Sequence, residues 1–317
     1  MSESKPILIV GLGMVGLIHG YALAQAGFEV IHKVRPGKTA REEITIDLLD
    51  LRNPEPQNLL DIYRPKLVKR LEDKLEFQLV MFPVSASQMA GAVRETASVI
   101  DPLKSQYLLF GSNWEGRAAI DEIIPHESYL WGYSAASGGW GEDGVFYANL
   151  RPDYRIGDPQ SRGITPRLEE VIKIFAAAGL KPDFQPDILG WLWMHFALNA
   201  ALVGSALYAG GLDKITEQAE LSYYAGREGL AVLEKRGLKP EDYPDARPFL
   251  EMSPREYAEK FLKPYAEQPI SLRVQKAGHF KSNPEEMKSF AREVQKTARE
   301  LGLPTPHLDL MVEKPGG

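Results

Sequence analysis

The sequence predicts an α/β domain over residues 1–186 followed by an all-helical domain over residues 187–317. Short apolar runs that end at glycine or proline alternate with helical patterns in the first part, which is typical of a parallel sheet with crossover helices. From residue 187 to residue 301 the apolar spacing is helical, and no strand-like alternation is found. The length of 317 residues agrees with two domains, because one domain takes about 150 residues.

Each expected strand of the first domain is a short apolar run bounded by turn residues. These runs are residues 6–10, 28–34, 77–84, 107–110, 129–132, 145–150 and 181–185. Helical spacing predicts helices over residues 17–26, 65–75, 87–100 and 166–178. Gly27 and Gly179 follow the first and last of these helices, as is common at a helix C-terminus. The glycine-rich stretch 137–144 is expected to be a loop.

The second domain is expected to hold helices over residues 188–212, 253–265 and 285–301, with the proline-rich stretch 239–254 as a long connection. Residues 188–212 are apolar enough and long enough to span a bilayer. His195 and Asn199 lie in the middle of this stretch, where polar groups are costly in lipid. We therefore interpret it as a buried helix of a soluble protein and expect no membrane span.

Composition excludes several classes of function. Lys and Arg total 37 against 43 Asp and Glu, and the net charge of −6 argues against a nucleic-acid-binding protein. The chain contains no Cys, which excludes disulfides, thiolate nucleophiles and iron–sulfur clusters and fits the reducing cytoplasm. The six His residues lack metal-ligand spacing, so no metal site is expected. Only one Lys precedes the first apolar run, which is not the pattern of a signal peptide.

The strongest motif is the GxGxxG run at the end of the first expected strand. Its residues are Gly11, Leu12, Gly13, Met14, Val15 and Gly16. Within a strand–helix–strand unit, the three glycines allow a tight turn, a close approach of the backbone to a pyrophosphate, and close packing of helix on strand. The alternative is a purely structural turn between strand and helix. The context favours a Rossmann-type dinucleotide-binding domain.

The end of the second expected strand indicates which dinucleotide binds. An NAD-binding domain usually carries an Asp or Glu there to hold the ribose, but residues 32–38 contain no acid. Arg35, with help from Lys33 or Lys38, could instead hold a 2′-phosphate. A solvated basic loop is the structural alternative. The charge pattern predicts NADPH as the cofactor.

His195 and Asn199 are four residues apart, so they share one face of the long apolar helix. Polar groups in such a helix need partners or a cavity. A histidine beside a nicotinamide could donate a proton to a carbonyl oxygen, and an asparagine could hold the substrate. A core histidine with satisfied hydrogen bonds is the alternative. Glu286, in the expected first turn of the last helix, has a structural explanation as part of a capping box.

These motifs together resemble the ketopantoate reductase family, which pairs a Rossmann domain with a helical domain like that of 6-phosphogluconate dehydrogenase. The segments ILIVGLGMVG and GFEVIHKVRPG carry the resemblance at the N-terminus, and HFALNAALVGSAL carries it in the helical domain. The resemblance places the family's 2′-phosphate arginine on Arg35, two asparagines on Asn113 and Asn199, and the substrate glutamate on Glu286. It also assigns Val84 and Ser85, at the end of the expected strand 77–84, to the cofactor site.

The chain departs from this family at three positions. The family's proton-donating lysine falls on His195, a second lysine falls on Ser85, and a further asparagine of the helix falls on Val203. An imidazole with an ordinary pKa of about 6.5 is a stronger acid than an ammonium group at about 10.4, and its charge depends on pH near neutrality. The resemblance therefore implies the fold and the cofactor, but not ketopantoate as the substrate.

Three functions remain open at this point. The first is NADPH-dependent reduction of a small 2-oxo acid or related carbonyl to the hydroxy compound, with His195, Asn199 and Glu286 as catalytic residues. The second is an opine- or imine-forming dehydrogenase on the same scaffold, because these similar enzymes use a histidine as acid and base. The third is a non-catalytic NADPH-binding sensor that has lost the lysines. A homodimer is expected from the apolar helical domain.

Overall fold

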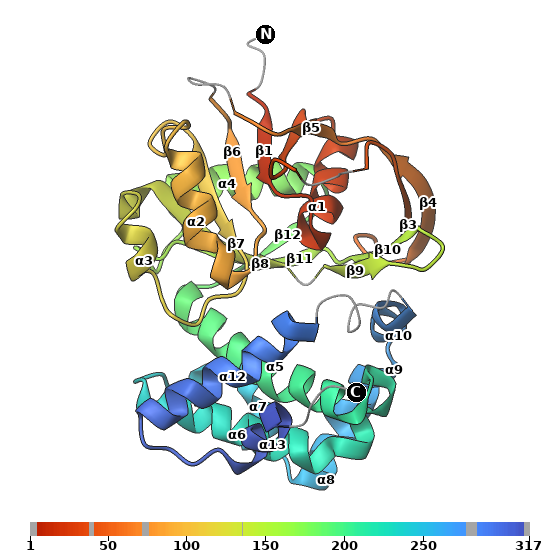
Figure 1. The fold of residues 1–317 in the computed structure, drawn as a ribbon, viewed down its shortest axis with the longest axis vertical. Helices are drawn as coiled ribbons and strands as arrows, with labels where there is room; N and C mark the ends of the chain where they lie inside the picture. The colour runs from red at the N-terminus through yellow and green to blue at the C-terminus, as the bar shows by residue number, and fades with distance from the viewer. Residues whose placement is uncertain (1–4, 38–40, 72–75, 135, 277–283, 314–317) are drawn as a thin grey trace. The chain divides into compact units, whose positions relative to one another are not determined.

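The structure is a computed structural model that describes residues 5–37, 41–71, 76–134, 136–276 and 284–313 (Figure 1). The chain divides into two compact units, Met1–Leu189 and Gly190–Gly317. The first unit is a mixed α/β domain of the Rossmann type, and the second is helical. The fold class predicted from the sequence is therefore confirmed.

In the described residues the first unit contains an eight-stranded sheet with the order β12-β11-β8-β7-β6-β1-β2-β5. Its strands are β1 (Ile7–Val10), β2 (Val30–Lys33), β5 (Lys66–Val68), β6 (Leu79–Phe82), β7 (Gln106–Phe110), β8 (Tyr129–Ser134), β11 (Asp153–Gly157) and β12 (Lys181–Phe184). From β5 to β8 all neighbours are parallel, and β11 is antiparallel to β8. The parallel part has the strand order of a dinucleotide-binding sheet, in which ligands bind where the order reverses beside the first strand.

Helices cover both faces of this sheet. The helical segments of the unit are α1 (Met14–Gln25), α2 (Ala86–Ala97), α3 (Ala118–Asp121), the 3₁₀ turn η1 (His126–Ser128) and α4 (Pro166–Ala177). Figure 1 shows α2 in front of the strands and α4 behind them. Apolar side chains of α1 and α4, among them Leu17 and Phe175, join one buried core with the strands. The predicted helices 17–26, 87–100 and 166–178 are confirmed within a few residues.

A second sheet, which the sequence analysis does not predict, joins this unit. It has the order β4-β3-β10-β9. Its strands are β3 (Ile44–Asp50), β4 (Gln57–Tyr63), β9 (Ser137–Trp140) and β10 (Phe146–Leu150). In β3 the apolar Ile44, Ile46 and Leu48 alternate with Thr45 and Asp47, so one face enters the core while the other carries polar groups.

Two expectations about this region are wrong. The helix expected over 65–75 is not formed by residues 65–71, where residues 66–68 are strand β5 beside β2. Residues 72–75 lie outside the described residues. The loop expected over 137–144 is a strand in its first half, because β9 pairs with β10. In both cases the strand is held by pairing with a distant segment, which local composition does not show.

The second unit contains helices and turns among its described residues. These are α5 (Ile188–Ala209), η2 (Leu212–Gln218), α6 (Ala219–Lys235), η3 (Pro240–Asp242), η4 (Pro244–Ala246), α7 (Arg247–Leu250), α8 (Pro254–Glu256), the π-helical η5 (Tyr257–Leu262), α9 (Lys263–Glu267), α10 (Pro269–Lys276), α12 (Pro284–Glu300) and α13 (Pro306–Glu313). The expected connection 239–254 is largely short helices, because its prolines occupy the first turns of η3, η4 and α7.

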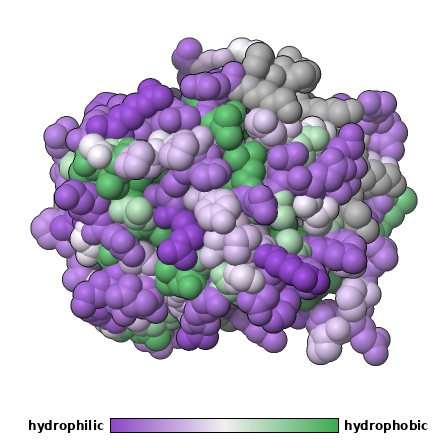
Figure 2. Space-filling view, turned by 90° about the horizontal axis from the view of Figure 1, so that it is seen from below, coloured by the Kyte–Doolittle hydropathy of each residue, from purple (hydrophilic) through white to green (hydrophobic). Residues whose placement is uncertain are grey.

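Among the described residues, one helix is long and apolar enough to cross a membrane by length and composition: α5, with a mean hydropathy of 1.3. Within its apolar window 67% of the residues are buried inside the protein, as in the core helix of a soluble protein. The face of the molecule in Figure 2 is mostly hydrophilic, with apolar residues in small groups. Length and composition alone therefore do not assign α5 to a bilayer.

Candidate functional site

The glycine motif forms the turn between β1 and α1. Gly11 has a φ of 111°, which a side chain would strain, and a Cβ on Gly13 would meet no atom within 4 Å. A Cβ on Gly16 would lie 3.1 Å from a side-chain atom of Pro83 and 3.2 Å from one of Ile9, so a side chain there would force these neighbours to move by a few tenths of an ångström. The turn is thus open to solvent at Gly13 and tightly packed at Gly16. The first-turn N–H groups of α1 have no helical acceptor and can bind an anion.

Val84 and Ser85 lie beside this turn, after the carboxyl end of β6. The Val84 side chain would be 3.9 Å from a Cβ on Gly11. Ser85 is the N-cap residue of α2, and its hydroxyl is 3.3 Å from that of Ser87. Because β6 is the parallel neighbour of β1 on the side opposite β2, these residues and the glycine turn share the edge where the strand order reverses.

Of the three basic residues predicted for the 2′-phosphate, the two that the structure describes occupy different environments. Lys33, the last residue of β2, is 7% exposed, and its Nζ forms an ion pair with Glu95 of α2 at 2.7 Å. Arg35, two residues later, is exposed, and it has no ion-pair partner among the described residues. Lys38 lies outside the described residues. The structure thus leaves the Arg35 guanidinium, and not the Lys33 ammonium, available to a ligand.

Asn113 closes the loop that follows β7. Its side chain is 4% exposed, and its Nδ2 donates to the Gly116 carbonyl at 2.9 Å. The Gly116 N–H donates in return to Asn113 Oδ1 at 2.7 Å. Both ends of the amide are therefore used within the loop. Asn113 thereby shapes the loop backbone at the carboxyl ends of the strands, the edge of the sheet that also carries the glycine turn.

His195 and Asn199 meet on one face of α5, as the sequence predicts. Asn199 Nδ2 donates to His195 Nε2 at 2.9 Å, which requires a neutral imidazole with its proton on Nδ1. The Trp191 ring stacks on the imidazole, with 4.9 Å between centroids and 14° between planes. Trp191 Nε1 donates to Asp245 Oδ2 at 3.0 Å. Trp191 is not among the predicted site residues, although its spacing of four residues from His195 places it on the same helix face.

Glu286 lies in the first turn of α12, and its side chain is outside the described residues. His195, Asn199 and Glu286 belong to the helical unit, and the other predicted site residues belong to the α/β unit. In the described parts of the chain, no group of three or more His, Asp or Glu side chains could hold a metal ion.

Two fully buried histidines contact the glycine motif from inside the domain. His19 Nδ1 donates to the Val15 carbonyl at 2.9 Å, and the Ser134 hydroxyl is 3.2 Å from its Nε2. His32 Nδ1 donates to the Gly11 carbonyl at 3.0 Å. Burial lowers the pKa of both imidazoles from 6.5 to about 4, although the backbone hydrogen bonds oppose this shift. Both side chains are therefore neutral at pH 7.

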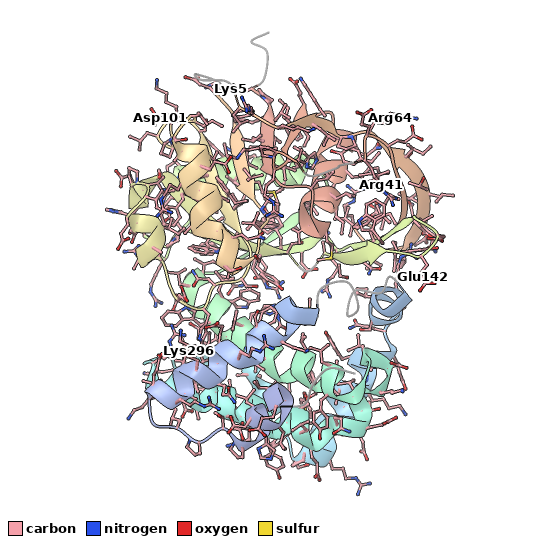
Figure 3. All side chains as sticks on the ribbon, in the orientation of Figure 1. Lys5, Arg41, Arg64, Asp101, Glu142 and Lys296 are labelled. Atoms are coloured by element: carbon pink, nitrogen blue, oxygen red, sulfur yellow. The ribbon has the colours of Figure 1, made fainter. Side chains whose placement is uncertain are left out.

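A cavity of about 460 Å³ opens at the opposite edge of the sheet. Lys5, labelled at the top of Figure 3, lines the cavity together with Gln78 and Gln106. These three residues lie at the amino ends of β1, β6 and β7, respectively. Ligands of open α/β sheets bind at the carboxyl ends of the strands. This cavity is therefore separate from the glycine turn.

The comparisons with known proteins agree with this geometry. The family model for "Ketopantoate reductase PanE/ApbA" matches residues 7–161. No curated protein matches the sequence significantly.

Three solved structures illustrate the likeness in fold. A 2-dehydropantoate 2-reductase from Geobacter metallireducens GS-15 is 18% identical, with a TM-score of 0.71 over 97% of each chain. A D-mandelate dehydrogenase bound to NADH and anilino(oxo)acetate is 16% identical, with a TM-score of 0.71 over 98% of this chain and 96% of that one. A dimeric ketopantoate reductase from Staphylococcus aureus is 17% identical, with a TM-score of 0.64 over 97% of this chain and 96% of that one. By sequence over residues 7–161, and by fold over almost its whole length, the chain is similar to ketopantoate reductases.

Proposed function

We propose that the protein is a member of the ketopantoate reductase family that uses NADPH to reduce a small 2-oxo acid, or a related carbonyl, to the hydroxy compound. The observation that carries the proposal is the glycine turn of residues 11–16 at the strand-order reversal of the sheet. Its positive φ at Gly11 and its open surface at Gly13 fit a pyrophosphate against the N-terminus of α1.

The likeness to D-mandelate dehydrogenase supports the substrate class. Anilino(oxo)acetate, bound in that protein, carries a carbonyl beside a carboxylate, as 2-oxo acids do. That protein binds NADH, which supports a nicotinamide cofactor. The family model describes ketopantoate reductases, and ketopantoate is itself a 2-oxo acid. The side chain of the substrate is left to the experiment below.

The chain's own residues have the following roles in this proposal. When bound, the reduced nicotinamide supplies a hydride to the carbonyl carbon. Protonated His195 donates its Nε2 proton to the carbonyl oxygen, which otherwise would gain a full negative charge. Once His195 has lost this proton, Nε2 accepts a hydrogen bond from Asn199 Nδ2, which lies 2.9 Å away, and the amide thereby stabilises the neutral imidazole. Glu286, which the family resemblance identifies as the substrate glutamate, is proposed to bind the substrate. Asn113 orders the loop at the cofactor edge.

Arg35 is the residue that we propose to select NADPH over NADH. Replacing it with Ala removes a charge-assisted hydrogen bond to the 2′-phosphate, which stabilises a complex by about 1.5–3 kcal/mol. We expect the Kd for NADPH, measured by calorimetry, to rise by roughly 10- to 100-fold, and the Kd for NADH to stay within about twofold. Arg64→Ala is the matched control, because Arg64 is exposed in the same unit and pairs with Glu43 (Figure 3). Equal Kd values for NADPH in wild type and Arg35→Ala would remove this assignment.

The test of the function is a turnover assay. Pure protein is mixed with NADPH or NADH and a panel of 2-oxo acids with varied side chains, each with and without a mixture of amines. Turnover with a 2-oxo acid alone supports the proposal. Turnover only in the presence of an amine supports the imine-forming alternative, which His195 in place of a lysine favours. Dinucleotide binding without any turnover supports a sensor.

We also propose that the protein acts as a homodimer in the cytoplasm. The dimeric Staphylococcus aureus structure, whose fold is similar, supports the oligomeric state. Analytical ultracentrifugation at micromolar concentration tests it, and a purely monomeric species would contradict it.

A further inference from the structure

We propose that His32 is a positioning residue for the dinucleotide turn and that Tyr63, from the second sheet, holds it in place. This inference rests on the proposed binding of a dinucleotide and goes beyond it. It assigns a binding role to a histidine outside the glycine motif and to the strand β4.

The hydrogen bonds of His32 determine which nitrogen carries the proton. Its side chain is 0% exposed, Nδ1 lies 3.0 Å from the Gly11 carbonyl oxygen, and Nε2 lies 2.9 Å from the Tyr63 hydroxyl. A carbonyl oxygen only accepts, so Nδ1 carries the proton and Nε2 accepts from the Tyr63 O–H. The Gly11 carbonyl thus determines the tautomer, and the Tyr63 hydroxyl holds the ring at its other nitrogen.

Space for this pair exists only because α1 has a glycine at position 20. A Cβ on Gly20 would lie 2.4 Å from His32 Nε2 and 3.1 Å from the Tyr63 hydroxyl oxygen. Real Cβ atoms do not approach other atoms at 2.4 Å, so any side chain there would displace the imidazole. Gly20 lies outside the GxGxxG motif, and the contact with His32 and Tyr63 explains why a glycine is needed at this point of the helix.

The bond to Gly11 orients the next peptide group. The Gly11 carbonyl points inward, toward the buried His32, and a Cβ on Gly16 would lie 3.3 Å from its oxygen. In a planar trans peptide the C=O and the following N–H point in opposite directions. The N–H of Leu12 therefore points away from His32 and out of the core. An N–H in this orientation is available to donate to a pyrophosphate bound at the turn.

The inference is tested by calorimetry of NADPH binding at pH 7.5 with two substitutions of the same residue. His32→Leu removes the donor to Gly11, whereas His32→Asn keeps a side-chain N–H near the position of Nδ1. We expect the Kd to rise about tenfold or more in His32→Leu and to stay within about threefold of wild type in His32→Asn. Because the turn acts on binding, KM for NADPH should rise in His32→Leu while kcat at saturating dinucleotide changes little.

Tyr63→Phe tests whether Tyr63 holds His32 in place. It also provides a test of the proposal if His32→Leu does not fold. It removes one hydroxyl and leaves the imidazole without its second partner, so we expect weaker NADPH binding. Tyr21→Phe is the matched control. Its hydroxyl donates to Asp61 at 2.8 Å, its ring packs on that of Tyr63, and it should leave the Kd unchanged.

The outcomes separate this inference from the proposed function. Wild-type protein that binds neither NADPH nor NADH overturns both. Wild-type protein that binds NADPH, with folded His32→Leu binding equally well, overturns this inference alone. If His32→Leu does not fold, weaker binding by Tyr63→Phe supports the inference and unchanged binding overturns it.

Discussion

Replacing His195 with alanine is expected to lower kcat for the 2-oxo acid by a factor of about 10² to 10⁴, the range that a positioned general acid contributes. The described residues place one imidazole on α5, stacked on Trp191 and bonded to Asn199. Without it, water must protonate the alkoxide that hydride transfer creates. Steady-state kinetics from pH 5.5 to 9 measure the effect, with the Kd for NADPH expected to stay unchanged.

Two further variants make this result specific. His126→Ala is the control, because His126 is an exposed histidine of the α/β unit, with its side chain 62% exposed, and should leave kcat unchanged. His195→Lys should regain part of the activity, with an optimum at higher pH, because an ammonium group ordinarily loses its proton near pH 10.4. If His195→Ala retained full kcat/KM across this pH range, His195 would not be the acid.

The second large effect is a loss of stability in mild acid. His19 and His32 have a pKa of about 4 in the folded protein, because burial disfavours the charged imidazole, whereas an unfolded histidine has a pKa near 6.5. Between these values the unfolded state binds more protons, so the free energy of unfolding falls as the pH falls from about 6.5 to 4. At pH 4.5 each histidine should lower the free energy of unfolding by about 2 kcal/mol relative to pH 7.

Urea unfolding at pH 7.0 and 4.5 measures this loss. In His32→Asn, whose side chain does not titrate, the difference in unfolding free energy between the two pH values should be about 2 kcal/mol smaller than in wild type. The exposed His126 again serves as the control, since His126→Ala should not change the difference. An equal pH dependence in wild type and His32→Asn would show that His32 is not neutral and buried in solution.

The parts of the fold that the sequence predicts are those built from neighbouring segments. The run β1–turn–α1–β2 carries its own signals, because the apolar spacing, the three glycines of the motif and Gly27 all lie within about thirty residues. The second sheet does not carry such signals. Its β3 pairs in parallel with β10, and Ile46 lies opposite Phe146, so no local window contains both strands.

The candidate site shows the same division. Periodicity alone brings His195 and Asn199 together, because four residues make about one helical turn. The ion pair of Lys33 with Glu95 and the contact of His32 with Tyr63 join segments of different strands and helices. The ion pair with Glu95 neutralises Lys33, which the charge pattern along the sequence assigns to the cofactor. Such contacts depend on the tertiary fold, which a reading of charges along the chain does not include.

The pairing of β3 with β10 also has a consequence for the order of folding. Strand β3 emerges from the ribosome about 100 residues before the strand that covers its inner edge. Until Phe146–Leu150 have been made, β3 and β4 can form only a hairpin, and a two-stranded hairpin is marginally stable in water. Ile44, Ile46 and Leu48 then lack Phe146, Ala148 and Leu150 of their buried core. A nascent chain shorter than about 150 residues is therefore expected to bind chaperones through this hairpin, and the α/β unit to fold late in synthesis.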